Sequence, residues 1–425
     1  MTSAAVACGL LVTRQTHADE PPLGGEPTVM REPGEVVDVI DAFDGDDPID
    51  VTAGLRFELD VDGAKVAREA GGGSTPRAAW SEVTSRLVPT LAVGLWQDFA
   101  VSVELPVILS RSTSLDPVGG AASGALVPGA DPVATLPLAA PERSGIERVD
   151  VGIAKGIMNQ ARDRSLPTWM VAVELGFDVS EPMHACNGTP PDGEVACADP
   201  ADRDRDGKRD GDEPALASAI DPGIARGTLE IALRTAISRR IRWFEPYGIF
   251  ETSFEVPIAK SPLTDALDES SDAGLPVRGT LSFGLMLVPW ENRERFARIT
   301  LDTRLLGGFV TRGLATTEVF DALGASADAA LRAPVAGPTG DVYESGVSVE
   351  AAHGTLGARA AFSWRASQII RLGVGAGIIH ALAHRITDAT PGDALYRAPV
   401  DAAGARLSVE GSYRVSVSAE GAVLF

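Results

Sequence analysis

Basic residues are scarce in this chain of 425 residues: Lys and Arg together number 37, against 59 Asp and Glu, and the formal net charge is −22. So acidic a chain repels phosphate backbones, which excludes nucleic acid as a partner. Long apolar runs are also missing, and no stretch of about twenty apolar residues is available for a membrane-spanning helix. A strand-built membrane protein remains open, because each crossing strand needs only about ten alternating residues.

Histidine is also scarce, with five residues in the chain. We find no Gly-rich phosphate loop and no Ser-His-Asp signature, so the sequence predicts a protein that is not an enzyme. His380 and His384 are four residues apart and would share one face of a strand. We interpret them as members of a polar belt at the outer rim rather than as a metal pair.

The last nineteen residues, Leu407 to Phe425, carry the clearest pattern. Every second residue from Leu407 onward is apolar or small, apart from the Tyr413 hydroxyl, and most residues between them are polar. A strict period of two predicts a strand with one apolar face, about 60 Å long at roughly 3.3 Å per residue. A long final strand that ends on Phe resembles the closing strand of bacterial outer-membrane β-barrels, in which the terminal residue signals assembly. The alternative is an edge strand of a soluble β-sandwich.

The same alternation recurs and predicts an all-β fold, a single transmembrane antiparallel up-and-down barrel of about 12 strands. The predicted strands are Val51–Val61, Val83–Leu95, Phe99–Leu109, Arg148–Met158, Pro167–Val179, Ala225–Ile237, Phe244–Val256, Val277–Leu287, Ala297–Phe309, Leu356–Trp364, Ile370–Ile378 and Leu407–Phe425. Short and long connections alternate, as expected for inner turns and outer loops. The longest predicted outer loops are 111–143, 181–222 and 312–345, and the last contains an Ala-rich piece, 317–333, that favours a short helix.

Charged residues fall in the register opposite to the apolar one. A Lys or Arg in the lipid-facing register costs about 2–4 kcal/mol at mid-bilayer, so the charges must face the lumen. The predicted lumen-lining residues are Arg56, Glu58, Arg86, Glu104, Glu174, Arg226, Glu230, Arg234, Glu251, Glu255, Arg298, Asp302, Arg304, Arg359 and Arg371. Two interpretations fit this set: the charges pair and fill a narrow lumen, or they line a small hydrated pore.

The N-terminal residues precede the first predicted strand. An apolar run at 4–12 and small residues before Asp19 predict a signal peptide over 1–18. Residues 19–50 then form a periplasmic segment, which is either a small plug or an exposed acidic lead-in. The barrel domain is expected to cover 51–425.

The loop 181–222 contains one metal-like motif, D-x-D-x-D-G-x5-E. Alternate carboxylates at this spacing converge on one hard cation, with a backbone carbonyl and a bidentate Glu completing the set. The expected calcium ligands are Asp202, Asp204, Asp206, Lys208, Asp210 and Glu213. The loop resembles thrombospondin type 3 repeats, and the alternative is a solvated acidic loop. In an oxidising compartment we expect Cys186 and Cys197 of the same loop to form a disulfide.

Two stretches resemble a known family. They are 91–106, with Leu91-Ala92-Val93-Gly94-Leu95-Trp96-Gln97-Asp98-Phe99 at its start, and Asp150-Val151-Gly152-Ile153-Ala154-Lys155-Gly156 followed by 171–179. They are similar to outer-membrane barrels associated with the meta pathway of phenol degradation. The resemblance implies a transporter-like barrel for hydrophobic or aromatic solutes.

The sequence therefore favours a channel in the cell outer membrane that lets small solutes pass. The expected partners are outer-membrane lipid, a small solute and the barrel-assembly machinery, reached through Phe425. The alternative function is a closed structural or adhesive barrel with a calcium-stiffened outer loop.

Overall fold

The computed structural model describes residues 51–95, 98–120, 124–127, 134–160, 163–187, 196–197, 208–209, 213–214, 222–259, 261–270, 272–292, 295, 297–324, 335–337, 340–342, 346–367 and 369–424. The predicted segments 1–18 and 19–50, and Phe425, lie outside these residues. No helix in the described part of the chain is long and apolar enough to cross a membrane.

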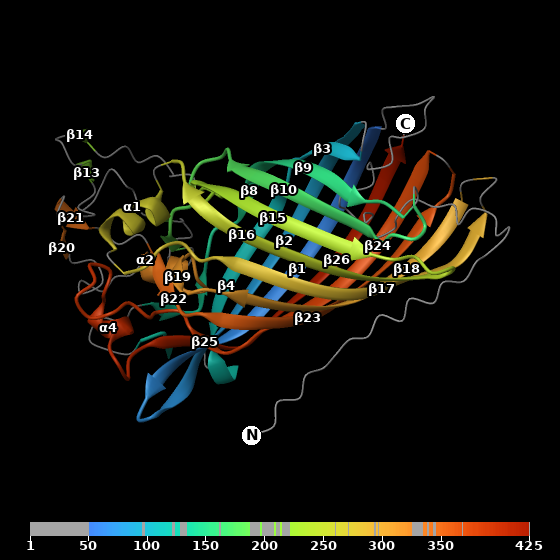
Figure 1. Ribbon diagram of the computed structural model, residues 1–425. Coiled ribbons are helices and arrows are strands. Elements are labelled where there is room, and N and C mark those ends of the chain that lie inside the picture. Colours follow the sequence, from blue (N-terminus) through green and yellow to red (C-terminus); the bar gives the residue numbers. More distant parts are fainter. Residues whose placement is uncertain are drawn as a thin grey trace, which may run out of the picture.

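Twelve antiparallel strands close into a barrel (Figure 1), as the alternation predicts. In order around the wall they are β1 (Val51–Ala70), β26 (Leu407–Leu424), β24 (Ile370–Ala381), β23 (His353–Arg365), β18 (Ala297–Val310), β17 (Arg278–Asn292), β16 (Phe244–Pro257), β15 (Thr228–Ser238), β10 (Thr168–Asp178), β9 (Arg148–Met158), β3 (Phe99–Glu104) and β2 (Gly73–Leu95). Pairing of β1 with both β2 and β26 closes the wall, which leaves no free sheet edge.

The first connection differs from the prediction. We expected a polar loop of about twenty residues after Val61, but β1 continues to Ala70 and β2 begins at Gly73. Gly71 and Gly72 both have positive φ, so two residues suffice to turn the chain. The hairpin projects at the outer end of the barrel, where Figure 1 draws it in blue.

Other wall strands also run beyond their predicted ends. The third strand is interrupted at Leu105-Pro106 and resumes as β4 (Val107–Pro117), which pairs with β2, β7 (Leu138–Ala139) and β8 (Arg143–Ile146). The predicted loop 111–143 therefore begins within β4 and ends at the first residue of β8.

The remaining elements gather at the outer end (Figure 1). They are η2 (Val118–Gly120), β5 (Gly124–Ala125), β6 (Thr135–Leu136), β11 (Cys186–Asn187), β12 (Ala196–Cys197), β13 (Lys208–Arg209), β14 (Glu213–Pro214), α1 (Pro262–Glu269), β19 (Gly313–Ala315), α2 (Phe320–Gly324), β20 (Val335–Gly337), β21 (Gly340–Val342), β22 (Ser348–Glu350), β25 (His384–Arg385) and α4 (Ala398–Asp401). The helix expected within 317–333 is α2, and the described part of that segment ends at residue 324.

Each wall strand exposes a large apolar side chain on the outside. These include Phe57, Leu91, Val103, Ile153, Val173, Leu233, Phe250, Leu281, Leu305, Phe362, Val374 and Val417. Near the inner turns, four exposed Trp side chains follow this belt: Trp169, Trp243, Trp290 and Trp364. Indole rings favour the membrane–water interface, so the belt and its aromatic rim match a bilayer.

The closing strand β26 departs from strict alternation at Gly411, whose φ is +62°. The register with β1 shifts here: Tyr413 pairs with Gly63, whereas Glu410 pairs with Lys65. This bulge turns Leu407 and Val409 into a buried core, while Val417 and Val423 face lipid. The apolar residues of this strand therefore lie on two different faces, whereas the alternation predicted a single apolar face.

Candidate functional site in the barrel lumen

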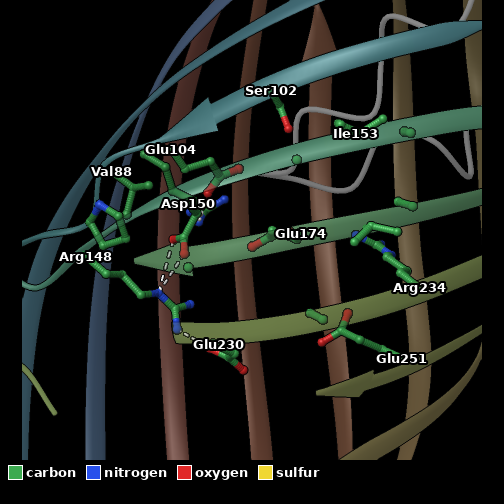
Figure 2. A pocket seen from close by; sticks show the side chains of 18 of the residues that line it. Val88, Ser102, Glu104, Arg148, Asp150, Ile153, Glu174, Glu230, Arg234 and Glu251 are labelled. Atoms are coloured by element: carbon green, nitrogen blue, oxygen red, sulfur yellow. Dashed lines mark hydrogen bonds and ion pairs between the residues drawn. The ribbon is translucent and has the colours of Figure 1, made fainter. Parts of the chain in front are cut away.

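The barrel lumen encloses a cavity of about 260 Å³ in its charged middle section. Eight of the predicted lumen residues line it: Arg56, Glu58, Arg86, Glu104, Glu174, Glu230, Arg234 and Glu251. Figure 2 shows Glu104, Glu174 and Glu251 projecting from three different strands of this wall. The alternation of side chains places them together, because every second residue of neighbouring strands faces the axis.

Ion pairs run through this wall from strand to strand. Arg56 Nε lies 2.8 Å from Glu58 Oε1, and Arg86 Nη1 lies 3.5 Å from Glu58 Oε2. Arg86 Nη2 also lies 3.1 Å from Asp60 Oδ2. Arg56 further contacts Glu104 on β3 at 3.4 Å. Arg56 thus meets carboxylates of β1 and β3, and Arg86 of β2 meets two carboxylates of β1, which offsets the desolvation of these charges.

A second group of pairs centres on Arg148. Its Nε lies 2.9 Å from Asp150 Oδ1, and its Nη1 contacts Glu230, as the dashed lines in Figure 2 show. At the outer end of the same wall, Glu255 pairs with Arg226 at 3.1 Å and with Arg278 at 2.7 Å. Arg226 lies just before β15 rather than within it.

The opposite wall is rich in arginine. Arg298, Arg365 and Arg371 are direct neighbours on β18, β23 and β24, and Arg304 faces Arg359 six residues further out along β18. Asp302 lies 3.5 Å from Arg304, and Glu420 lies 3.8 Å from Arg371. Like charges in one cross-strand row repel each other, so this inner end of the lumen favours anions.

Arg365 and Glu420 were missed by sequence reasoning. Arg365 lies one residue beyond the predicted strand end at Trp364, and the alternation from Arg359 through Ala361 and Ser363 continues to it. Extending that alternation by one residue would have found it.

Between these charged groups, the wall carries very small side chains. Gly373, Gly375 and Gly377 of β24 pair with Glu420, Ser418 and Ser416 of β26. A Cβ atom at Gly375 would lie only 2.8 Å from Ser418 Oγ. A barrel of eight strands is just wide enough for side chains to fill, so twelve strands with such a small-residue stripe leave space at the axis.

An apolar cluster, which we call the cap core, lies at the outer end of the barrel. Its members are Ala64, Val66, Ala78, Leu115, Leu126, Val127, Ala134, Leu136, Leu138, Val319, Ala322, Leu323, Ile386, Val400, Leu407 and Val409. They come from β1, β2 and β26 of the wall and from β4, β6, β7, α2, α4 and the segments beside them. Arg143 ties α2 to this assembly by a 2.8 Å ion pair with Asp321.

The loop 181–222 is described only in part. Cys186 and Cys197 are joined in a disulfide between β11 and β12. Lys208 and Glu213 lie in the β13–β14 hairpin, whereas Asp202, Asp204, Asp206 and Asp210 lie outside the described residues.

No family model and no curated protein sequence matches this chain. Among solved structures, an outer-membrane channel from Pseudomonas putida F1 is similar at 9% identity, with 88% of this chain and 95% of that chain covered and a TM-score of 0.40. The β domain of the Bordetella autotransporter BrkA follows at 10% identity, 88% and 100% coverage and a TM-score of 0.38. The CymD monoaromatic hydrocarbon channel has 8% identity, 88% coverage of each chain and a TM-score of 0.31.

Similarities at this level of identity and TM-score support no conclusion about function. The chain's own features decide its location. A closed barrel satisfies all backbone hydrogen bonds in lipid, and the apolar belt with its Trp rim fits the bilayer. The chain is an outer-membrane β-barrel.

Proposed function

We propose that this barrel is a channel for the passive passage of small solutes across the outer membrane. The cavity of about 260 Å³ in the lumen is the observation that carries this proposal. A purely structural barrel would gain stability by filling that space, whereas a channel must keep it hydrated.

For the solute, we propose hydrophobic or aromatic molecules that carry a carboxylate or another anionic group. The arginine row at the inner end supports the anionic part. The resemblance to barrels of the meta pathway of phenol degradation supports the aromatic part, and membership of that family is itself part of this proposal.

A second candidate function rests on the cap core. Its apolar side chains pack together at the outer end, which favours a closed structural or adhesive barrel whose outer loops bind a partner. In that case the carboxylates from Asp202 to Glu213 would stiffen the loop 181–222 by binding calcium.

Planar-bilayer conductance of the refolded full chain separates the two candidates. Discrete open steps that a small aromatic carboxylate reduces would support the channel. The absence of any step, from protein that shows the heat-modifiable gel band of a folded barrel, would overturn it in favour of the closed barrel.

The calcium site has its own test, limited proteolysis of the folded protein with calcium or with EDTA. We expect EDTA to increase cleavage within 181–222 and to leave the β1–β2 hairpin unaffected, because only that loop carries the motif. Equal cleavage in both conditions would refute calcium binding there.

A further inference from the structure

Three side chains meet where the cap joins the barrel wall. Glu350 ends β22, which pairs with β19 in the cap. His353 is the first residue of wall strand β23, and His384 begins β25, which pairs with the outer end of β26. Our interpretation of His384 as a polar-belt residue was wrong, because β24 ends at Ala381 and the His384 side chain turns inward, with 4% of it exposed.

The donor atoms of this cluster converge. His384 Nε2 lies 3.1 Å from Glu350 Oε1, and His353 Nδ1 lies 3.6 Å from the same oxygen. His353 Nδ1 also lies 3.2 Å from the carbonyl oxygen of Ala351, so metal binding through this nitrogen replaces that hydrogen bond. One nitrogen of each ring and the carboxylate oxygen all lie within 4.8 Å of one another. Ligands about 2.0–2.2 Å from a tetrahedral zinc ion are roughly 3.3–3.6 Å apart, so small rotations suffice for all three to bind one ion.

The hydrogen bond at Nδ1 of His384 decides which ring nitrogen faces the cluster. Its Nδ1 lies 2.8 Å from the carbonyl oxygen of Leu382, which only accepts hydrogen bonds, so Nδ1 carries the proton. In the neutral ring, the Nε2 lone pair then faces the carboxylate of Glu350. Two electron-rich atoms at 3.1 Å repel unless a proton or a metal ion lies between them. A backbone carbonyl that holds the distant ring nitrogen is also the usual support of a metal-binding histidine.

The second ring adds a further donor beside the first. The imidazoles of His353 and His384 are stacked, with centroids 3.7 Å apart and planes 10° apart. A proton between His384 and Glu350 uses only one of the two rings, whereas one divalent ion can be shared by both neutral rings and the carboxylate. Imidazole with one carboxylate selects zinc, nickel or copper over calcium and magnesium.

We propose that Glu350, His353 and His384 form a site for one divalent transition-metal ion of the zinc class, which fastens the cap to the barrel wall. The fourth position remains for water. His384 also lines an outer groove of about 520 Å³, together with Glu69 and Glu410, and this groove provides the entry path. The site is independent of the channel proposal and of the oxygen-rich calcium motif.

Zinc titration by calorimetry tests the site, using the full chain in detergent micelles, without a polyhistidine tag and with excess calcium to occupy the acidic loop. We expect one zinc ion per chain. His353→Ala and His384→Ala should each weaken binding by more than about tenfold, because each removes a direct ligand. His380→Ala is the matched control, since His380 is exposed on the outside of β24, and it should bind as the wild type does.

Two further measurements distinguish the loss of a metal ligand from misfolding of the variants. Glu350→Gln keeps the shape of the side chain and should also weaken zinc binding. Copper in place of zinc should give an electron paramagnetic resonance spectrum with two coordinated nitrogens, and with one in either His→Ala variant. No bound zinc, or zinc binding that none of these three positions changes, would leave a proton as the occupant and overturn the proposal.

Discussion

Gly411 illustrates how a single residue decides the course of the closing strand. Its positive φ creates the bulge that separates the lipid-facing part of β26 from the part that enters the cap core. A side chain at this φ is strained, and a β-branched one most of all.

We therefore expect Gly411→Val to destabilise the barrel by about 1–3 kcal/mol. Gly421→Val is the matched control, because Gly421 has no positive φ and a Cβ there would meet only an ordinary contact 3.6 Å away. The measurement is the free energy of unfolding in urea after refolding into lipid vesicles. Equal losses in both variants would mean that the bulge does not require glycine.

Asp401 is a second residue whose surroundings predict a measurable effect. Burial raises the pKa of its carboxyl to about 6, although Ala389 N and Arg397 N donate hydrogen bonds to it at 3.0 and 2.8 Å and the guanidinium groups of Arg397 and Arg406 lie nearby. The folded cap then holds this proton at pH values where the unfolded chain has lost it.

Because the folded pKa is raised, the contribution of this group to stability is greatest below its ordinary pKa and is lost as pH rises through about 6. The change is of the order of 3 kcal/mol. Hydrogen exchange of the Ala389 amide, corrected for intrinsic rates between pH 4 and 7, should report it. Asp401→Asn should flatten the profile, and an unchanged profile would contradict the assignment.

At the scale of elements, α2 contributes Ala322 and Leu323 to the cap core at the outer end of the barrel. The helix is too short to be stable alone, so it depends on the burial of Leu323 and Phe320 and on the ion pair of Asp321 with Arg143. Such a small unit can open without unfolding the wall, since the wall strands are held by their own ladders.

We expect Leu323→Asp to open the cap, because a charge in the apolar cap core costs several kcal/mol. The frequency of open steps in planar bilayers should then rise at least tenfold. Leu166→Asp in the turn between β9 and β10 is the control and should behave like the wild type. If the Leu323 variant folds and stays silent, α2 is not the gate.

At the scale of the whole molecule, the two walls of the lumen carry different charge patterns. The wall from β1 to β15 is a network of paired charges, whereas β18, β23 and β24 align arginines in rows. An ion that crosses the barrel therefore meets a more positive potential near the inner turns than in the middle.

Removal of that charge should change ion selectivity. We expect Arg365→Gln, in the cap-opened Leu323→Asp background, to lower the ratio of anion to cation permeability roughly twofold to fivefold. The reversal potential in a KCl gradient measures this ratio. Arg385→Gln, at an exposed position outside the lumen, serves as control and should leave the ratio unchanged.

Much of the fold and of the candidate site was predictable because both depend on a period of two. Arg56, Glu104 and Glu230 alternate with lipid-facing neighbours, and the cost of a charge in lipid leaves them only one side of the sheet. The bulge at Gly411 was not predictable, because glycine in a strand fits a bulge, a close approach or a plain pair equally well.

The sequence by itself thus determined a closed antiparallel barrel, its lipid-facing belt and the charged register of its lumen, since strand geometry and the bilayer permit no other placement of these residues. Only the tertiary structure decided what lies at the outer end. The cap core unites Val66, Leu323 and Leu407, and the cluster of Glu350, His353 and His384 unites three elements. These residues are far apart in the sequence and meet only because the loops fold together at the outer end. Such contacts leave no periodic pattern in the sequence from which they could be predicted.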